Sequence, residues 1–312
     1  MAAPGSGLGA QLGFEVETTK NTREVPTHFI DFLNESLSYE IDRIQSQGLR
    51  NRRLSHRWGA GNRMVTGSVD FELTAETVGE WLRACIDGAP VTAGAGPYTH
   101  TYSPDTLKSL TIQIGKPDTG GVVRVFDYIG MMVQSWSMSI RPNEFVQMST
   151  EFRGLNETIT ETLATASYSV FTGFTFAHAS LTIGGTEYCV DSLDVTGTNK
   201  LDVSNKICST NPGAPTIREA GMWEYGGNFE MDFENLNLYT LYRNATEGAL
   251  VVTLDAGASA KLIMTMNVRL DGDTPSVSGP DILKQTIPFV ATSASTDAAA
   301  FTAVLTNGDS TP

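Results

Sequence analysis

The stretches Val69-Asp-Phe-Glu-Leu73 and Phe229-Glu-Met-Asp-Phe233 decide the fold. In both, apolar residues alternate with acidic ones at a period of two, which is typical of a strand with one buried face. Apolar residues at helical spacing follow each stretch and predict one short helix after each strand. A glycine comes after each of these helices, Gly88 in one case and Gly248 in the other, as a helix C-terminal cap requires.

These stretches are the centre of a longer internal repeat. Gly67 matches Gly227 and Gly88 matches Gly248, so the offset between the copies is 160 residues. Four weaker matches extend the repeat: 35–41 with 191–197, 109–115 with 249–255, 134–140 with 262–268, and 145–152 with 285–291. We therefore predict a first domain over residues 1–156, a linker over 157–173 and a second domain over 174–312. Two unrelated β-rich domains with generic strand patterns are the alternative.

Length and composition exclude several classes of protein. The chain has 312 residues, of which 40% are hydrophobic and 18% charged, values that argue against a disordered or membrane-spanning chain. The net charge of −14 argues against a protein that grips duplex DNA. Residues 1–7 show neither the basic nor the apolar region of a secretory signal.

Residues for catalysis or metal binding are sparse. The three cysteines, Cys85, Cys189 and Cys208, show no CxxC spacing, which favours a reduced cytoplasmic chain. The histidines are far apart and show no metal-ligand spacing: His28, His56, His100 and His178. No nucleophile elbow, HExxH motif or Walker loop is present. The sequence therefore predicts no enzyme, no cofactor and no metal site.

A basic stretch interrupts this acidic chain. Residues 43–63 contain no acid and six arginines: Arg43, Arg50, Arg52, Arg53, Arg57 and Arg63. The same stretch includes Trp58 and several glycines, so we predict a long loop rather than a helix. Three interpretations stay open: a nucleic-acid-binding loop, a solvated loop, and an arm between subunits that docks on an acidic patch.

Four carboxylates form a second charge feature. Asp70 and Glu72 share the strand face opposite the apolar residues, and Glu230 and Asp232 do the same in the second copy. If this face lines a channel, its negative charge repels phosphate. A solvated outer face is the alternative interpretation.

The order of segments resembles a family. Gly13-Phe-Glu-Val-Glu-Thr18, Asn34-Glu-Ser-Leu-Ser-Tyr-Glu40, a long loop, Gly67–Leu73 and the helix ending at Cys85 are similar to a siphophage-type major tail tube protein. The resemblance covers roughly residues 8–154 and again 174–306. It implies a mainly β fold with two tandem tail-tube β-sandwich domains, each with one flanking α-helix. Neighbouring domains would join into a ring-shaped β-barrel around a DNA channel.

The resemblance also implies partners and a location. The chain would stack as a homo-oligomer, with trimeric pseudo-sixfold rings preferred and hexamers as the alternative. Its other partners would be a tape-measure protein and a tail terminator, with DNA passing through without specific binding and no membrane involved. The protein would reside in the virion tail, and in the host cytoplasm during assembly. Alternatives are the tube protein of a contractile tail, another phage structural protein, and a β-sandwich surface adhesin.

Overall fold

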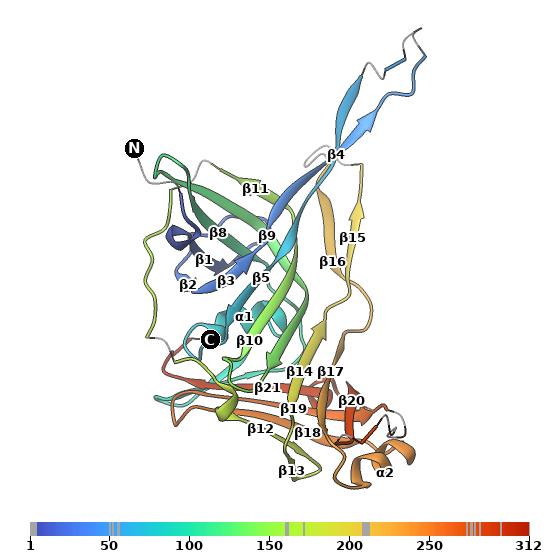
Figure 1. The fold of residues 1–312 in the computed structure, drawn as a ribbon. Coiled ribbons are helices and arrows are strands. Elements are labelled where there is room, and N and C mark those ends of the chain that lie inside the picture. Colours follow the sequence, from blue (N-terminus) through green and yellow to red (C-terminus); the bar gives the residue numbers. More distant parts are fainter. Residues whose placement is uncertain are drawn as a thin grey trace.

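The computed structural model describes residues 5–49, 51, 53–54, 57–159, 162–170, 172–207, 213–272, 274, 277, 279–280, 282–293 and 295–311. The chain is mainly β, as predicted (Figure 1). Nineteen of its strands belong to one connected sheet, and two more form a separate ribbon. Within the described residues the sheet does not close into a barrel. None of the helices in this part of the chain is long and apolar enough to span a membrane.

The first half of the chain contains eleven strands and one α-helix. A short 3-10 turn, η1 (Gly7–Gly9), precedes them. The elements are β1 (Gln11–Val16), β2 (His28–Ile30), β3 (Phe32–Glu35), β4 (Ser38–Gln45), β5 (Trp58–Glu72), α1 (Val78–Cys85), β6 (Val91–Ala93), β7 (Tyr98–Tyr102), β8 (Leu110–Pro117), β9 (Val123–Ile140), β10 (Gln147–Gly154) and β11 (Asn156–Thr158). The predicted strand at 69–73 therefore corresponds to the C-terminal end of β5, and the predicted helix corresponds to α1.

The second half begins with the 3-10 turn η2 (Phe176–His178). Its elements are β12 (Ala179–Ile183), β13 (Thr186–Tyr188), β14 (Ser192–Thr198), β15 (Leu201–Asn205), β16 (Pro215–Glu219), β17 (Glu224–Asp232), α2 (Asn237–Arg243), β18 (Gly248–Asp255), β19 (Lys261–Leu270), β20 (Lys284–Ala291), α3 (Asp297–Ala300) and β21 (Phe301–Asn307). The second predicted strand lies in β17, and the second predicted helix is α2.

Strand pairing follows the same order in both halves. In the first half β1 pairs with β8, β8 with β9, β9 with β10, β10 with β5, and β5 with β3 and β4. In the second half the order is β12, β18, β19, β20, β17 and β14. All of these pairs are antiparallel, and one helix follows β5 or β17 in each case. A duplication would leave this pattern, although the division into two tandem domains stays a prediction.

The two halves are joined by strand pairing and share one core. The C-terminal part of β9 pairs with β14, so that Trp136 lies opposite Gly197. Near the other end of the chain, β7 pairs with β21. Buried side chains from both halves form one contiguous cluster, which extends from Leu12 to Leu305. The halves are therefore parts of one packed body.

Two equivalent glycines allow close contact between neighbouring strands. A Cβ at Gly67 would lie 2.4 Å from the carbonyl oxygen of Ser36, and a Cβ at Gly227 would lie 1.9 Å from that of Asp194. Gly67 also has a φ of +139°, a backbone angle that residues other than glycine rarely adopt. The repeated glycine of the sequence thus corresponds to a repeated structural constraint.

We expect Gly227→Ala to lower the free energy of unfolding by about 1–3 kcal/mol, because the new methyl group would overlap backbone atoms that cannot move aside independently. Gly59→Ala is the matched control, since a Cβ there meets nothing within 4 Å. Chemical denaturation monitored by tryptophan fluorescence measures both. Equal stability of the two variants would contradict the close contact at Gly227.

The predicted linker lies along the first half. Its residues 157 and 158 belong to β11. The Gln113 side chain accepts a hydrogen bond from Ala164 N at 2.7 Å and donates one to the Thr162 carbonyl at 3.2 Å. Gln11 donates to the Ala164 carbonyl at 2.8 Å. The connection between the halves is therefore held against β1 and β8.

Candidate assembly and channel surfaces

One face of the sheet is open to solvent across both halves. The strands β5, β10, β9, β14, β17 and β20 are neighbours in this order, and each places alternate side chains in the core. In β10, for example, Thr150 and Phe152 are buried, whereas Ser149 and Glu151 are partly exposed. We call the side opposite the core the open face. Its members include Ser36, Ser68, Asp70, Glu72, Ser135, Ser137, Ser149, Glu151, Thr196, Thr198, Glu230 and Asp232.

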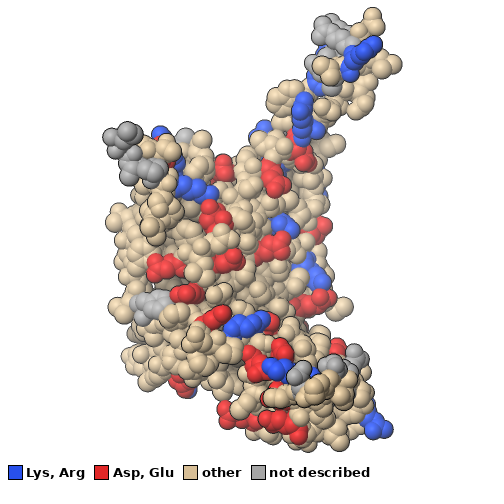
Figure 2. Space-filling model, in the orientation of Figure 1, with Lys and Arg blue, Asp and Glu red and all other residues tan. Residues whose placement is uncertain are grey.

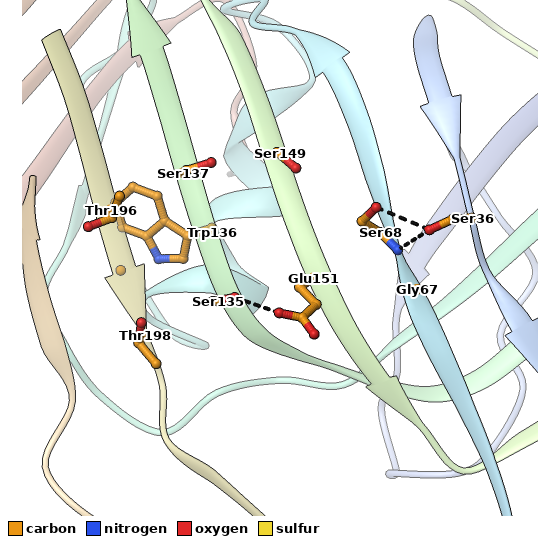
Figure 3. A pocket seen from close by; sticks show the side chains of 11 residues that line it. Ser36, Gly67, Ser68, Ser135, Trp136, Ser137, Ser149, Glu151, Thr196 and Thr198 are labelled. Carbon is orange, nitrogen blue, oxygen red and sulfur yellow. Dashed lines mark hydrogen bonds between the residues drawn. The ribbon is translucent and has the colours of Figure 1, made fainter.

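Small hydroxyl side chains cover the middle of the open face. Figure 3 shows them around a shallow hollow of about 560 Å³ where β5, β10, β9 and β14 run side by side. Ser36 and Ser68 are hydrogen-bonded to each other, and Ser135 donates to Glu151 at 3.1 Å. These hydroxyl groups are short and neutral, and Glu151 is the charged side chain that lines the hollow with them.

All four carboxylates that the sequence singled out lie on the open face. Asp70 accepts a hydrogen bond from Ser149 at 2.5 Å, whereas Asp232 is exposed. The structure separates the four into two pairs, because β10, β9 and β14 lie between β5 and β17. They therefore share a face but do not form one cluster.

The second pair of carboxylates, Glu230 and Asp232, affects the pKa of Lys284. The hydrogen bond from Lys284 to Asp191 raises the pKa of this lysine, and the charges of Glu230 and Asp232 raise it further. Every one of these effects stabilises the protonated amine.

The basic stretch belongs to a two-stranded arm. Residues 43–45 and 58–63 of the predicted loop are strand, whereas the described residues from 46 to 57 lie outside both strands. Strand β4 continues to Gln45 and β5 begins at Trp58, and the two pair along the arm. Figure 1 shows this arm, residues 38–63, projecting away from the body. Arg43, Arg53 and Arg57 are exposed on it, and Trp58 has 69% of its surface exposed. Arg50 and Arg52 lie outside the described residues.

The base of the arm contacts the second half. Arg63 N donates to the Gly213 carbonyl at 2.7 Å, next to the ribbon formed by β15 and β16. Arg63 is thus the member of the predicted set that lies closest to the body of the molecule. The arm carries Arg43, Arg53 and Arg57 into solvent, and Figure 2 shows basic side chains along it.

The ribbon β15–β16 occupies the corresponding place in the second half but does not project freely. Ile217 packs in a buried cluster with Leu107, Met132 and Leu155 of the first half. Lys20 donates to the Ile217 carbonyl at 2.6 Å. Apolar side chains hold this ribbon against the body, whereas the arm carries arginines instead.

The first half has a free strand edge where the second half has none. Strands β3 and β4 pair only with β5 among the described residues. Their counterpart β14 pairs with β17 on one edge and with β9 on the other. An unpaired edge of this kind is a template for a strand from another chain.

Sequence reasoning missed the seam between β9 and β14. Arg141 makes two hydrogen bonds to the Asp194 carboxylate, at 2.8 and 2.7 Å, across this seam. Asn199 donates to the carbonyls of Cys85 and Val133, which ties β14 to α1 and β9. The only sequence signal was the polar and apolar alternation of residues 134–140, which does not identify a partner strand.

The described histidines and cysteines do not come together. His100 is buried and hydrogen-bonded to Thr92 and Asn307, and His28 lies beside Glu15. Cys85 is buried and Cys189 exposed, both as free thiols, while Cys208 and His56 lie outside the described residues. In the part of the chain that the structure describes, no group of three metal-ligating side chains occurs.

Comparison with known proteins identifies one family. A family model described as phage tail tube protein matches residues 7–291. The matched range begins ahead of β1 and ends with β20, so it includes both halves, the arm and the β9–β14 seam. No curated protein matches the chain significantly.

Proposed function

The chain belongs to the phage tail tube protein family, and from this membership we propose that it builds the tube of a long, non-contractile tail as stacked rings. Membership makes it a structural protein of the bacteriophage virion tail. The finer proposal is that each chain supplies two tandem tube domains, residues 1–156 and 174–312, separated by the linker 157–173. During assembly the subunits would be in the host cytoplasm.

The free edge of β3 and β4 carries this proposal. Inside the chain, β9 already pairs with the equivalent edge of β14. The same type of pairing between chains would continue the sheet from the second half of one subunit to the first half of the next. Each ring would then be a closed β-barrel without unpaired edges.

The continuity of the sheet favours trimeric rings over hexameric ones. Because β9 and β14 are neighbours, both halves of the chain contribute strands to the same wall. Three chains would therefore supply six tube domains in a pseudo-sixfold ring. A hexamer, the alternative, would place the second half outside the wall and would have to break this seam.

We further propose that the open face lines the channel through which DNA passes without specific binding. Its hydroxyl groups are neutral and the carboxylates of Asp70, Glu72, Glu230 and Asp232 repel phosphate. The cations beside them, Arg153, Arg141 and Lys284, are paired with Glu151, Asp194 and Asp191. A single pair of charges in water interacts by only about 1 kcal/mol, but charges repeated around a ring sum into a field. A tape-measure protein and a tail terminator are the further partners that a tube of defined length requires.

Negative-stain electron microscopy and analytical ultracentrifugation of the purified protein test the assembly. We expect rings and tubes, with the smallest ring having the mass of three chains. A ring with the mass of six chains would refute the trimer. A protein that stays monomeric at high concentration would refute the proposed function itself.

Charge reversal on the open face tests the channel. We expect tubes of the Glu72→Lys, Asp232→Lys variant to retain DNA in a salt-dependent manner, because cations in the wall attract phosphate. Wild-type tubes should release it. Asp105→Lys with Glu247→Lys is the matched control, since both acids are exposed outside the strands of the open face. If the control retains DNA equally, the open face is not the channel wall.

A further inference from the structure

A groove of about 240 Å³ lies at the end of the molecule that carries β12 and β13. Its floor is apolar and is formed by Ile140, Leu181, Tyr188 and Leu193, all buried. Phe176, which is 44% exposed, stands at its rim. Figure 1 shows β13 at the opposite end of the molecule from the arm. A chain therefore cannot place its own arm in its own groove.

Acidic side chains surround this groove. Glu187 and Asp191 line it, and Glu230 is adjacent because its strand position pairs with Ser192. The nearby cations are already engaged: Arg141 pairs with Asp194 at 2.7 Å and Lys284 pairs with Asp191 at 2.7 Å. Among the described residues Glu187 and Glu230 have no ion pair. Figure 2 shows acidic side chains gathered at this end of the molecule.

The arm has the complementary chemistry. Its exposed apolar side chains are Ile44 at 60%, Leu49 at 102%, Leu54 at 83% and Trp58 at 69% exposure. Arginines alternate with them along the chain, and no acid occurs between residues 43 and 63. Exposed apolar side chains grouped in this way mark an interaction surface. Tryptophan and arginine are also the residues most often found at the energetic centre of interfaces.

We propose that the groove receives the arm of another copy of this chain. The apolar side chains of the arm would cover the groove floor, and its arginines would lie against Glu187, which lines the groove without an ion pair among the described residues. Such a contact joins different surfaces of two identical molecules, and between stacked rings it propagates along the tube axis instead of closing. The inference rests on the proposed tube function and assigns the surface on which one ring receives the next.

Cys189 provides a native reporter, because its exposed thiol lines the groove. In a Cys208→Ser background, Leu49→Cys, Leu54→Cys and Trp58→Cys each place a thiol on the arm. Under mild oxidation of assembled tubes, we expect at least one of these variants to form disulfide-linked multimers in non-reducing electrophoresis. The geometry of a disulfide requires the two Cα atoms to approach within about 7 Å, so linkage reports direct docking.

Two controls define the result. Adding Cys189→Ser to the same variants should abolish the multimers. Leu8→Cys, at an equally exposed leucine outside the arm, should not form them. Tubes in which none of the three arm cysteines links to Cys189 would overturn the inference and leave the tube function intact. A wild-type protein that forms neither rings nor tubes would instead refute the proposed function.

A charge exchange gives a second measurement without cysteines. We expect Glu187→Arg to reduce the fraction of rings that stack roughly tenfold or more. The contact is repeated around each ring, so the free energy lost at each copy adds to the total. Arg53→Glu with Arg57→Glu should restore stacking in the Glu187→Arg protein. Sedimentation separates single rings from tubes. Wild-type stacking by Glu187→Arg would contradict docking in this groove.

Discussion

Stacked tubes are expected to disappear when Arg50, Arg52 and Arg53 are replaced together by glutamate. The substitution reverses three charges on the arm, so the arm would repel the acidic end of the neighbouring subunit instead of attracting it. The fraction of subunits in tubes should fall at least about tenfold, which corresponds to a loss of about 1.4 kcal/mol in the contact. Sedimentation and electron microscopy at low ionic strength, where the effect of charge is least screened, measure it.

The control for this prediction is Lys206→Glu with Arg243→Glu, which reverses exposed basic residues outside the arm. This variant should form tubes as the wild type does. Normal tubes from the arginine variant would refute the role of the arm in assembly. The arm would then be a solvated hairpin or a nucleic-acid-binding element, the other two interpretations that the sequence allowed.

The largest effect on stability is expected from Trp81→Ala. Trp81 on α1 is fully buried, and the rings of Phe14, Phe71 and Phe152 approach it edge-on with centroid distances of 4.9, 5.2 and 5.5 Å. Its indole N–H donates to Thr150 at 2.9 Å. Removal of the ring leaves a cavity and takes this hydrogen bond from Thr150, so the free energy of unfolding should fall by about 3–5 kcal/mol.

Trp58→Ala is the matched control, because it removes the same side chain from the exposed arm. We expect it to change the free energy of unfolding by less than about 0.5 kcal/mol but to weaken tube assembly. Chemical denaturation of the two variants gives the comparison. A loss of several kcal/mol in Trp58→Ala would show that the arm packs on the body.

The sequence predicted the centre of each half correctly, because alternation and helical spacing there leave little choice. Strands β5 and β17 and helices α1 and α2 lie where residues 64–85 and 225–243 placed them. Their offset of 160 residues also holds in the structure, where Gly67 and Gly227 make the same close contact. These elements depend on local patterns, which a sequence records directly.

The outer matches of the repeat were wrong in register. The sequence paired residues 35–41 with 191–197, whereas Asn34 and Ser192 hold equivalent places opposite Asp70 and Glu230. It also paired 134–140 with 262–268, although the hairpins β8–β9 and β18–β19 place Met131 and Val268 at equivalent positions. The first shift is two residues, which preserves alternation, so pattern alone cannot detect it. The second is nine residues, so that match joined segments that are not equivalent.

Long-range partners could not be predicted at all. The pairing of Trp136 with Gly197 and the contacts of Ile217 with Leu107 depend on how distant segments meet. The glycines of the basic stretch correctly argued against a helix. The hairpin was not predicted, because strands that are exposed on both faces show no alternation of polar and apolar residues. The candidate groove was missed for the same reason, because its lining comes from five separate elements and turns.

The pairing of β21 with β7 has a consequence for biosynthesis. Thr101 and Val304 lie opposite each other, so β7 lacks this neighbour until residues 301–307 have left the ribosome. Contacts so distant along the chain also form slowly. This part of the sheet is therefore completed only after β21 has been synthesised, and a chain without β21 leaves this edge of β7 unpaired.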